Sequence, residues 1–168
     1  MKLLVIRHGA AMDRDEFAET GQSDDLRPLT AAGKREMKRV AKGLRAEIGS
    51  VDVLATSPLV RAVQTAEIVA DAYGIDITEK TTSLVPDAAF EEFEEWCTKL
   101  RNKEVVAVVG HEPHLSSLVT WLLSGRRESR IRLKKAGACL VEFDSEVRHD
   151  SGTLNWLQTP RQLEARGG

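Results

Sequence analysis

The sequence has only two cysteines and no long run of hydrophobic residues. Cys97 and Cys139 are too few for a disulfide framework, and neither belongs to a CxxC pair of the kind that binds zinc or exchanges disulfides. The apolar run at residues 3–6 is too short for a signal peptide, and no segment approaches the roughly 20 apolar residues that a membrane-spanning helix needs. We therefore expect a chain without a membrane segment that works in the reducing cytoplasm.

The chain also lacks an excess of either charge. Its 24 lysines and arginines nearly balance its 26 acidic residues, which gives a formal net charge of −2. Such a balance creates no strong overall field toward nucleic acid or a membrane surface, so any partner must be selected by a local site. With 168 residues and 42% hydrophobic content, the chain is long enough for one core and too short for two ordinary domains. We expect a single domain over residues 1–168.

Short apolar runs alternate with segments of helical periodicity. Runs typical of buried parallel strands occupy residues 2–6, 51–56 and 105–109. Apolar positions at helical spacing predict helices over residues 30–49, 58–74, 87–100 and 113–123. Shorter strands are expected at residues 75–78, 139–143 and 154–157. This alternation predicts a three-layer α/β/α sandwich with a mostly parallel sheet and right-handed crossovers.

Capping side chains mark where three of these helices are expected to begin. Thr30 and Asp87 are interpreted as N-caps, and Ser57 as a cap followed by proline at the first helical position. Residues 13–28 are polar, rich in acidic side chains and without periodicity, so they are interpreted as an exposed loop placed to cover a site.

Two of the predicted strands end in a loop that carries a histidine. His8 follows the first strand and His111 follows the strand at residues 105–109. The carboxyl ends of parallel strands border the ligand crevice of such a sheet, so the two histidines are expected to meet there. Arg61 lies at the start of a helix that also follows a strand, and helix N-termini favour anions. The predicted ligand is phosphate.

The residue types suit phosphoryl chemistry. The guanidinium groups of Arg7 and Arg61 bind phosphate oxygens with paired, charge-assisted hydrogen bonds. An imidazole such as that of His8 is partly unprotonated near neutral pH and can attack phosphorus, forming a covalent intermediate that water later hydrolyses. His111, if protonated, adds a hydrogen bond to oxygens that gain charge in the transition state. Gly9 lets the loop backbone approach the phosphate closely.

Three motifs, in this order, resemble those of the histidine phosphatase superfamily. They are LVIRHG at residues 4–9, SPLVRAVQTA at residues 57–66 and VGHE at residues 109–112. The small size of the chain, the segment RPLTAAG at residues 27–33 and the terminal pair Trp156 and Pro160 resemble the SixA-type phosphohistidine phosphatase branch. The resemblance extends over almost the whole chain.

This resemblance implies a phosphoglycerate mutase-like fold and a phosphatase without metal or cofactor. Carried over by position, it makes His8 the phosphorylated nucleophile and makes Arg7, Arg61 and His111 phosphate ligands. Arg27 becomes an additional residue of the substrate pocket, beside Gly9.

The chain departs from the mutase and acid phosphatase branches in one respect. No segment after Thr78 clearly matches their acidic proton donor, so the general acid is Asp87, Glu112 or absent. Asp87 is equally explained as a helix cap, and Glu112 as a residue that steers its loop. A phosphohistidine substrate reduces the need for an acid, because imidazole, with an intrinsic pKa of about 6.5, is a better leaving group than an alkoxide.

The sequence is compatible with three functions. The first is removal of phosphate from phosphohistidine on a protein, which suits a site with little chain available for a lid. The second is hydrolysis of small phosphomonoesters by the same chemistry. The third is a non-catalytic domain that binds or scaffolds phosphoproteins, which would keep the arginines but has no need for His8.

Other features have alternative explanations. His111 and His114 suggest a metal site, but Pro113 separates them and no cysteine or carboxylate pair completes a ligand set. The basic run at residues 126–135 is either a solvated face or a surface for an acidic protein. The aromatic stripe at residues 90, 93 and 96 is helical in spacing and without interleaved basic residues, so it is core and no nucleic-acid partner is expected.

Overall fold

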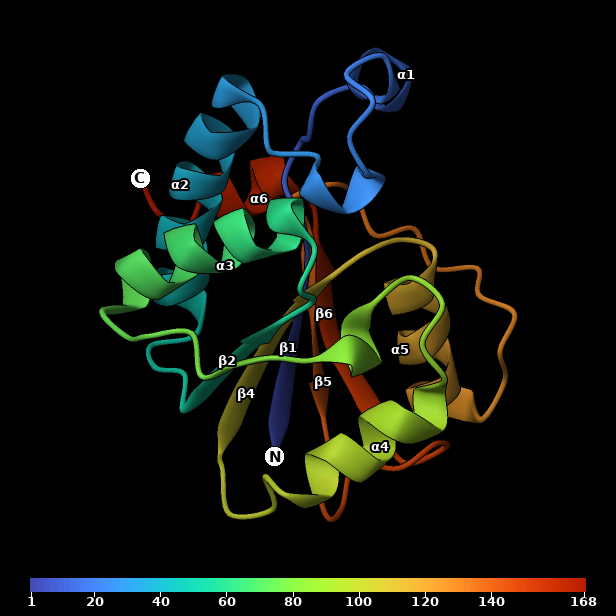
Figure 1. Ribbon diagram of the computed structural model, residues 1–168. Coiled ribbons are helices and arrows are strands. Elements are labelled where there is room, and N and C mark those ends of the chain that lie inside the picture. Colours follow the sequence, from blue (N-terminus) through green and yellow to red (C-terminus); the bar gives the residue numbers. More distant parts are fainter.

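A six-stranded sheet lies at the centre of the computed structural model, which describes residues 1–168 (Figure 1). The strands are β1 (Lys2–Arg7), β2 (Val53–Thr56), β3 (Glu79–Lys80), β4 (Val105–Gly110), β5 (Ala138–Glu142) and β6 (Thr153–Gln158). Their order in the sheet is β3-β2-β4-β1-β5-β6. The first four are parallel to one another, whereas β5 pairs antiparallel with both β1 and β6. The prediction of a mostly parallel sheet is confirmed.

Helices cover both faces of this sheet. They are α1 (Arg14–Ala18), α2 (Ala31–Glu47), α3 (Val60–Tyr73), α4 (Phe90–Thr98), α5 (His114–Ser124) and α6 (Pro160–Glu164), with short 3₁₀ helices at Asp24–Leu26 (η1) and Thr82–Leu84 (η2). Side chains of α2, α3 and α6 form one hydrophobic cluster against the sheet, and those of α4 and α5 form a second cluster on the other face. The structure is therefore the predicted three-layer α/β/α sandwich. None of its helices is both long and apolar enough to cross a membrane.

The strand pairing explains why two distant segments meet. β4 is buried along its whole length and β1 is buried at its four central residues, as expected for neighbouring strands with helices on both faces. In their parallel register Lys2 lies opposite Val105 and Arg7 lies opposite Gly110. Both strands therefore end at the same edge of the sheet, and His8 and His111 emerge there side by side.

Several helix starts differ from the sequence prediction. Thr30 is confirmed as the N-cap of α2, because its Oγ1 accepts a hydrogen bond from Gly33 N at 2.9 Å. The capping prediction for Ser57 is wrong: α3 begins at Val60, with Leu59 at the N-cap and no side-chain cap. The prediction for Asp87 is wrong too, because α4 follows Ala89 and also lacks a capping side chain.

Two further segments need correction. The strand expected at residues 75–78 lies at Glu79–Lys80 instead, where it pairs with Ala55 and Thr56 of β2; Thr78 only bonds to Leu54, through its N–H and its Oγ1. The segment at residues 13–28 is not without regular structure, since it holds α1 and η1. Asp13 caps α1 by accepting hydrogen bonds from Asp15 N and Glu16 N.

Candidate active site

A cavity of about 520 Å³ opens at the edge of the sheet where β1, β2 and β4 end. Its buried wall includes four residues that the sequence singled out: His8, Arg27, Arg61 and His111. Its exposed rim includes Asp13, Arg14, Pro113 and Lys135. Arg7 also lines this cavity. The structure thus brings the predicted nucleophile and all four of the basic residues predicted around it to one site.

A backbone hydrogen bond holds the side chain of His8 in one tautomer. Its Nδ1 lies 2.7 Å from the carbonyl oxygen of Gly9, in a position where His8 is 6% exposed. A carbonyl oxygen only accepts hydrogen bonds, so Nδ1 must carry the hydrogen. In a neutral imidazole the other nitrogen, Nε2, then has a free lone pair. His8 therefore presents Nε2 as a base or nucleophile.

The surroundings of His8 keep it neutral. Burial and, to a smaller extent, the charges of Arg61, Arg7 and Arg27 lower its pKa to about 4, although the Gly9 hydrogen bond opposes this shift. The unshifted pKa of histidine is about 6.5, so at neutral pH the ring would otherwise be partly protonated. The pocket thus favours the nucleophilic form.

Three buried nitrogens of residues that line this cavity have no hydrogen-bond partner within the protein. They are Nε of Arg7, Nε of Arg61 and Nδ1 of His111. Buried polar groups in folded proteins are rarely left unpaired, because their desolvation costs free energy. Two of the three belong to guanidinium groups, which bind tetrahedral oxyanions well. A cavity lined by two such guanidinium groups is suited to a phosphate group.

The position of Arg7 depends on a segment far along the chain. Its Nη1 donates to the carbonyl oxygen of Leu133 at 2.8 Å. Leu133 is 1% exposed and belongs to the core, so this contact is fixed relative to the sheet. Arg7 therefore has Nη1 anchored to the core, while its buried Nε has no partner in the protein.

Asp24 joins the other two arginines, and sequence reasoning missed it. Its Oδ1 accepts from Arg27 Nε at 2.7 Å, and its Oδ2 lies 3.2 Å from Arg61 Nη2. Arg61 Nη1 also donates to the backbone oxygen of Asp24 at 2.9 Å. Burial raises the pKa of Asp24, but the Arg27 hydrogen bond and the charges of Arg61, Arg27 and Arg14 outweigh this and hold its pKa below the usual range. The carboxylate thus orients both guanidinium groups.

His111 lies between Ser57 and His8 because β4 lies between β2 and β1. Its Nε2 is 2.8 Å from Ser57 Oγ, and its ring centroid is 5.1 Å from that of His8. Burial, with added effects from His8 and Arg61, lowers the pKa of His111 to about 3. With the protein's own groups alone, His111 is therefore neutral rather than protonated. Ser57 directly follows β2, as His8 follows β1. A polar residue in this position after a parallel strand is a candidate site residue, so this position in the sequence could have predicted the role of Ser57.

Gly9 does not line the cavity. Its N–H donates to Thr65 Oγ1 at 3.1 Å, and its carbonyl oxygen holds His8. A side-chain carbon at Gly9 would meet only ordinary contacts with Leu29 and Gly33. The contribution of Gly9 to the site is thus the carbonyl group that sets the hydrogen on His8.

The two candidate acids differ in position. Glu112 lines the cavity, and its Oε1 accepts from Ser116 N at 2.9 Å, at the start of α5. Asp87 does not line the cavity, although the preceding residue, Pro86, does. His114 is buried beneath this segment, with Nε2 3.2 Å from the carbonyl oxygen of Ala88. His114 therefore supports the rim and does not face the buried wall of the site.

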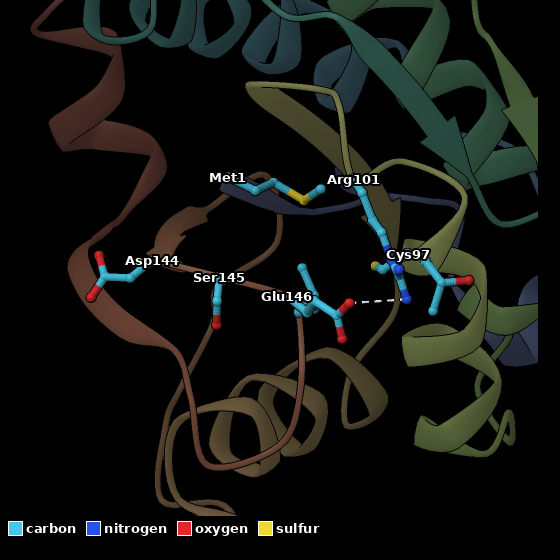
Figure 2. Close-up of a pocket in the computed structure, with 8 residues that line it drawn as sticks. Met1, Cys97, Arg101, Asp144, Ser145 and Glu146 are labelled. Atoms are coloured by element: carbon cyan, nitrogen blue, oxygen red, sulfur yellow. Dashed lines mark ion pairs between the residues drawn. The ribbon is translucent and has the colours of Figure 1, made fainter.

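A second cavity, of about 320 Å³, lies at the opposite end of the sheet (Figure 2). Met1 lines it, just before β1 begins, whereas His8 follows the other end of β1 roughly 20 Å away at the usual rise per residue. Arg101 and Glu146 form an ion pair of 3.0 Å across this cavity. It holds no histidine and none of the unpartnered nitrogens. No group of three or more His, Cys, Asp or Glu side chains is placed to hold a metal ion.

Comparisons with known sequences and structures indicate one family for this chain. Residues 3–83 match the family described as the histidine phosphatase superfamily (branch 1). An uncharacterized protein of Picosynechococcus sp. is 34% identical over 167 residues, covering 97% of this chain and 99% of its own. The phosphohistidine phosphatase SixA of Escherichia coli is 29% identical, with 98% and 97% covered. A solved structure of SixA complexed with tungstate has 28% identity and a TM-score of 0.81, with 97% of this chain and 99% of that chain covered.

Proposed function

This chain belongs to the histidine phosphatase superfamily and is a phosphatase, and we propose that its substrate is phosphohistidine on a protein in the cytoplasm. In this proposal His8 takes the phosphoryl group and water then removes it. Arg7, Arg61 and His111 bind the phosphoryl oxygens, with Arg27 beside them and no metal or cofactor.

One observation carries the proposed chemistry. His8 has its hydrogen fixed on Nδ1 by Gly9, which leaves Nε2 with a free lone pair, and His8 lines one cavity together with Arg7 and His111, each of which has a nitrogen without a partner in the protein. A nucleophile and oxyanion ligands are the two parts that phosphoryl transfer requires. The tungstate in the SixA structure is a tetrahedral oxyanion, which supports the same kind of ligand in this chain.

The first step forms a bond between His8 Nε2 and phosphorus as the bond between phosphorus and the substrate imidazole breaks. The leaving imidazole nitrogen keeps the bonding electron pair and takes a proton from solvent water. In the second step water attacks phosphorus, the bond to Nε2 breaks, and orthophosphate leaves with His8 again neutral. Charge on the phosphoryl oxygens is stabilised throughout by the guanidinium groups of Arg7 and Arg61.

The nature of the leaving group favours phosphohistidine. An imidazole leaving group, with an intrinsic pKa of about 6.5, departs with far less protonation than an alkoxide. Asp87 lies outside the cavity lining, and Glu112, which lines it, already has Oε1 engaged by Ser116 N, so the cavity offers one partly engaged carboxylate as an acid. The site has strong phosphate ligands and modest means for acid catalysis, which suits a labile P–N bond.

The shape of the cavity favours a protein donor. The rim residues Arg14, Pro113 and Lys135 are exposed, so the mouth of the cavity is open to solvent. A phosphoryl group that projects from a larger molecule can therefore reach His8 at the buried wall. The segment with α1 and η1 lies at this end of the sheet on the side of α3, which η1 contacts (Figure 1). A bulky donor can therefore stay outside while its phosphohistidine enters.

The alternative substrate is a small phosphomonoester. A cavity of about 520 Å³ is large enough to enclose such a molecule, and this observation favours that alternative. A non-catalytic phosphoprotein-binding domain is the third candidate, and the neutral, oriented His8 argues against it because simple binding does not need a nucleophile.

A parallel turnover assay tests the proposal. A phosphohistidine protein and a panel of small phosphomonoesters are compared in the presence of a chelator, with wild type and His8→Ala. We expect a larger kcat/KM for the phosphohistidine protein and loss of that activity in His8→Ala. A larger kcat/KM for a small ester would replace the substrate proposed here while keeping the nucleophile.

A further inference from the structure

The chain from α5 to β5 presents a row of cations along the outside of the molecule. Residues 130–134 alternate: Arg130, Arg132 and Lys134 are exposed, whereas Ile131 and Leu133 point into the hydrophobic cluster beneath α5. This segment is neither helix nor strand, yet the two apolar side chains anchor it. The three cations are thus held on one side of an ordered segment.

This row continues into the active-site cavity. Lys135 follows Lys134 directly and lines the rim of the cavity that contains His8. The carbonyl oxygen of Leu133, in the same segment, accepts the hydrogen bond from Arg7. In Figure 1 the segment passes outside α5 and reaches the end of the sheet where α1 lies. We call Arg130, Arg132, Lys134 and Lys135 the basic rim.

The charges of the basic rim are not neutralised by the protein. None of its four residues forms an ion pair. The nearby Arg127 is different, since it pairs with Glu91 and lies over the rings of Phe90 and Trp121, 5.1 and 5.7 Å from their centroids. Arg127 therefore stabilises the α4–α5 packing and is not part of the rim.

The concentration of positive charge here contrasts with the rest of the chain. Residues 126–135 contain six basic residues and one acidic residue, whereas the whole chain has a formal net charge of −2, so the remainder is net acidic. Like charges in one unpaired row repel each other and cost stability unless something else favours them. An acidic surface on a partner would remove this cost on binding. Because the basic rim lies beside the cavity, that acidic surface must lie close to the phosphoryl group that enters the cavity.

We propose that the basic rim docks an acidic protein surface that surrounds the phosphohistidine delivered to His8. This inference rests on the proposed function and adds the chemistry of the partner. The acidic side chains contact Arg130, Arg132 and Lys134, while the phosphohistidine passes Lys135 and enters the cavity. Electrostatic complementarity of this kind acts mainly on the rate of association and on the choice of partner.

The test uses the full chain and two phosphohistidine peptides. In one peptide the phosphohistidine is flanked on both sides by glutamates, and in the other by glutamines. The variant is Arg130→Glu/Arg132→Glu, which leaves Lys135 and the cavity unchanged. The matched control, Lys38→Glu/Lys42→Glu, makes the same charge change on the exposed face of α2, on the other side of the sheet. Turnover of free phosphoramidate reports on the cavity alone.

Wild type and the control are expected to prefer the glutamate peptide, with a KM that rises as salt is added because the charges are exposed and screened. Arg130→Glu/Arg132→Glu is expected to raise the KM of that peptide about tenfold and to remove most of its salt dependence. Its turnover of the glutamine peptide and of phosphoramidate should match that of the control. These results together would support the docking surface.

Three outcomes separate the possible failures. If wild type hydrolyses both peptides with equal KM, or if the rim variant behaves as the control does, the docking inference is wrong while the proposed function stands. If wild type hydrolyses neither peptide but does hydrolyse small esters, the proposed function is wrong as well. If the rim variant instead loses only the binding of an RNA oligonucleotide or of phosphatidylserine vesicles, the rim serves a different partner and the proposal is overturned.

Discussion

The Nδ1 atom of His8 lies 2.7 Å from the carbonyl oxygen of Gly9, and this single contact determines which nitrogen of the ring is free to react. The same loop thus supplies the side chain and sets its protonation pattern. Because Gly9 N is held by Thr65, which in turn bonds to the carbonyl oxygen of Arg61, the orientation of His8 is linked to the helix that carries a phosphate ligand.

The lowered pKa of His8 predicts a pH dependence of stability. Its pKa is about 4 in the folded protein and about 6.5 when unfolded, so the unfolded chain binds more protons between these values. The contribution of neutral His8 is therefore complete above about pH 6.5 and is lost as the pH falls toward 4, up to about 3 kcal/mol. Urea unfolding across this range should show a smaller pH slope in His8→Gln. An unchanged slope in His8→Gln would contradict this prediction.

Asp24 is expected to limit the affinity for phosphate. Asp24→Asn keeps an oxygen near Arg27 and Arg61 but removes a negative charge that competes with the ligand. Since the carboxylate is 41% exposed and partly screened, we expect inhibition by inorganic phosphate to strengthen by only about fivefold. The inhibition constant in a turnover assay measures this. Asp25→Asn, at the exposed neighbouring acid, serves as control, and weaker inhibition in Asp24→Asn would show that the charge itself is needed to orient the arginines.

Ser57 is expected to act as a positioning residue for His111. Ser57→Ala removes the only hydrogen-bond partner of His111 Nε2, 2.8 Å away, so the ring can no longer hold one orientation and protonation pattern. We expect kcat to fall about tenfold with KM little changed, as for the loss of one hydrogen bond worth about 1.4 kcal/mol in the transition state. Ser83→Ala removes another buried serine, which bonds to Thr81 away from the cavity. Equal effects of the two substitutions would indicate a purely structural role for Ser57.

Gly33 is expected to be essential to the packing behind His8. A side-chain carbon at Gly33 would lie 2.1 Å from the carbonyl oxygen of Ala10, two residues after His8. Gly33→Ala must therefore displace the backbone of the His8 loop, at a cost of about 1–3 kcal/mol in the free energy of unfolding. Gly49→Ala meets no atom within 4 Å and should leave stability nearly unchanged. Denaturant unfolding of the two variants measures the difference, and equal stabilities would contradict the packing argument.

The sequence was sufficient to predict the layers of the fold and the edge of the sheet at which the site lies. Buried runs such as β4, and the histidine loops after β1 and β4, can be recognised from short stretches of sequence. Because the carboxyl ends of parallel strands border one crevice, these loops are predicted to lie at the same site. The order of the strands, which places His111 between Ser57 and His8, is not visible in any local pattern.

The roles of Ser57 and Asp24 were not predicted, and both for the same reason. Ser57 has the sequence context of a helix cap, but it follows β2, the neighbour of β4 in the sheet, so its hydroxyl group meets His111 at the end of β4. Asp24 was only one of several acidic residues in a polar segment, and its contact with Arg61, 37 positions away, exists only because η1 folds back over α3. Side chains that orient other side chains through contacts between distant segments could therefore not be predicted from the sequence.

The most direct test of the account is a rapid-quench experiment with a phosphohistidine protein labelled in its phosphoryl group. Wild type should form a labelled intermediate that is stable in alkali and labile in acid, and mass spectrometry after digestion should place the phosphoryl group on His8. His8→Ala should form no intermediate and show no turnover. Turnover that persists in His8→Ala, or a label found on another residue, would contradict the central claim that His8 is the nucleophile.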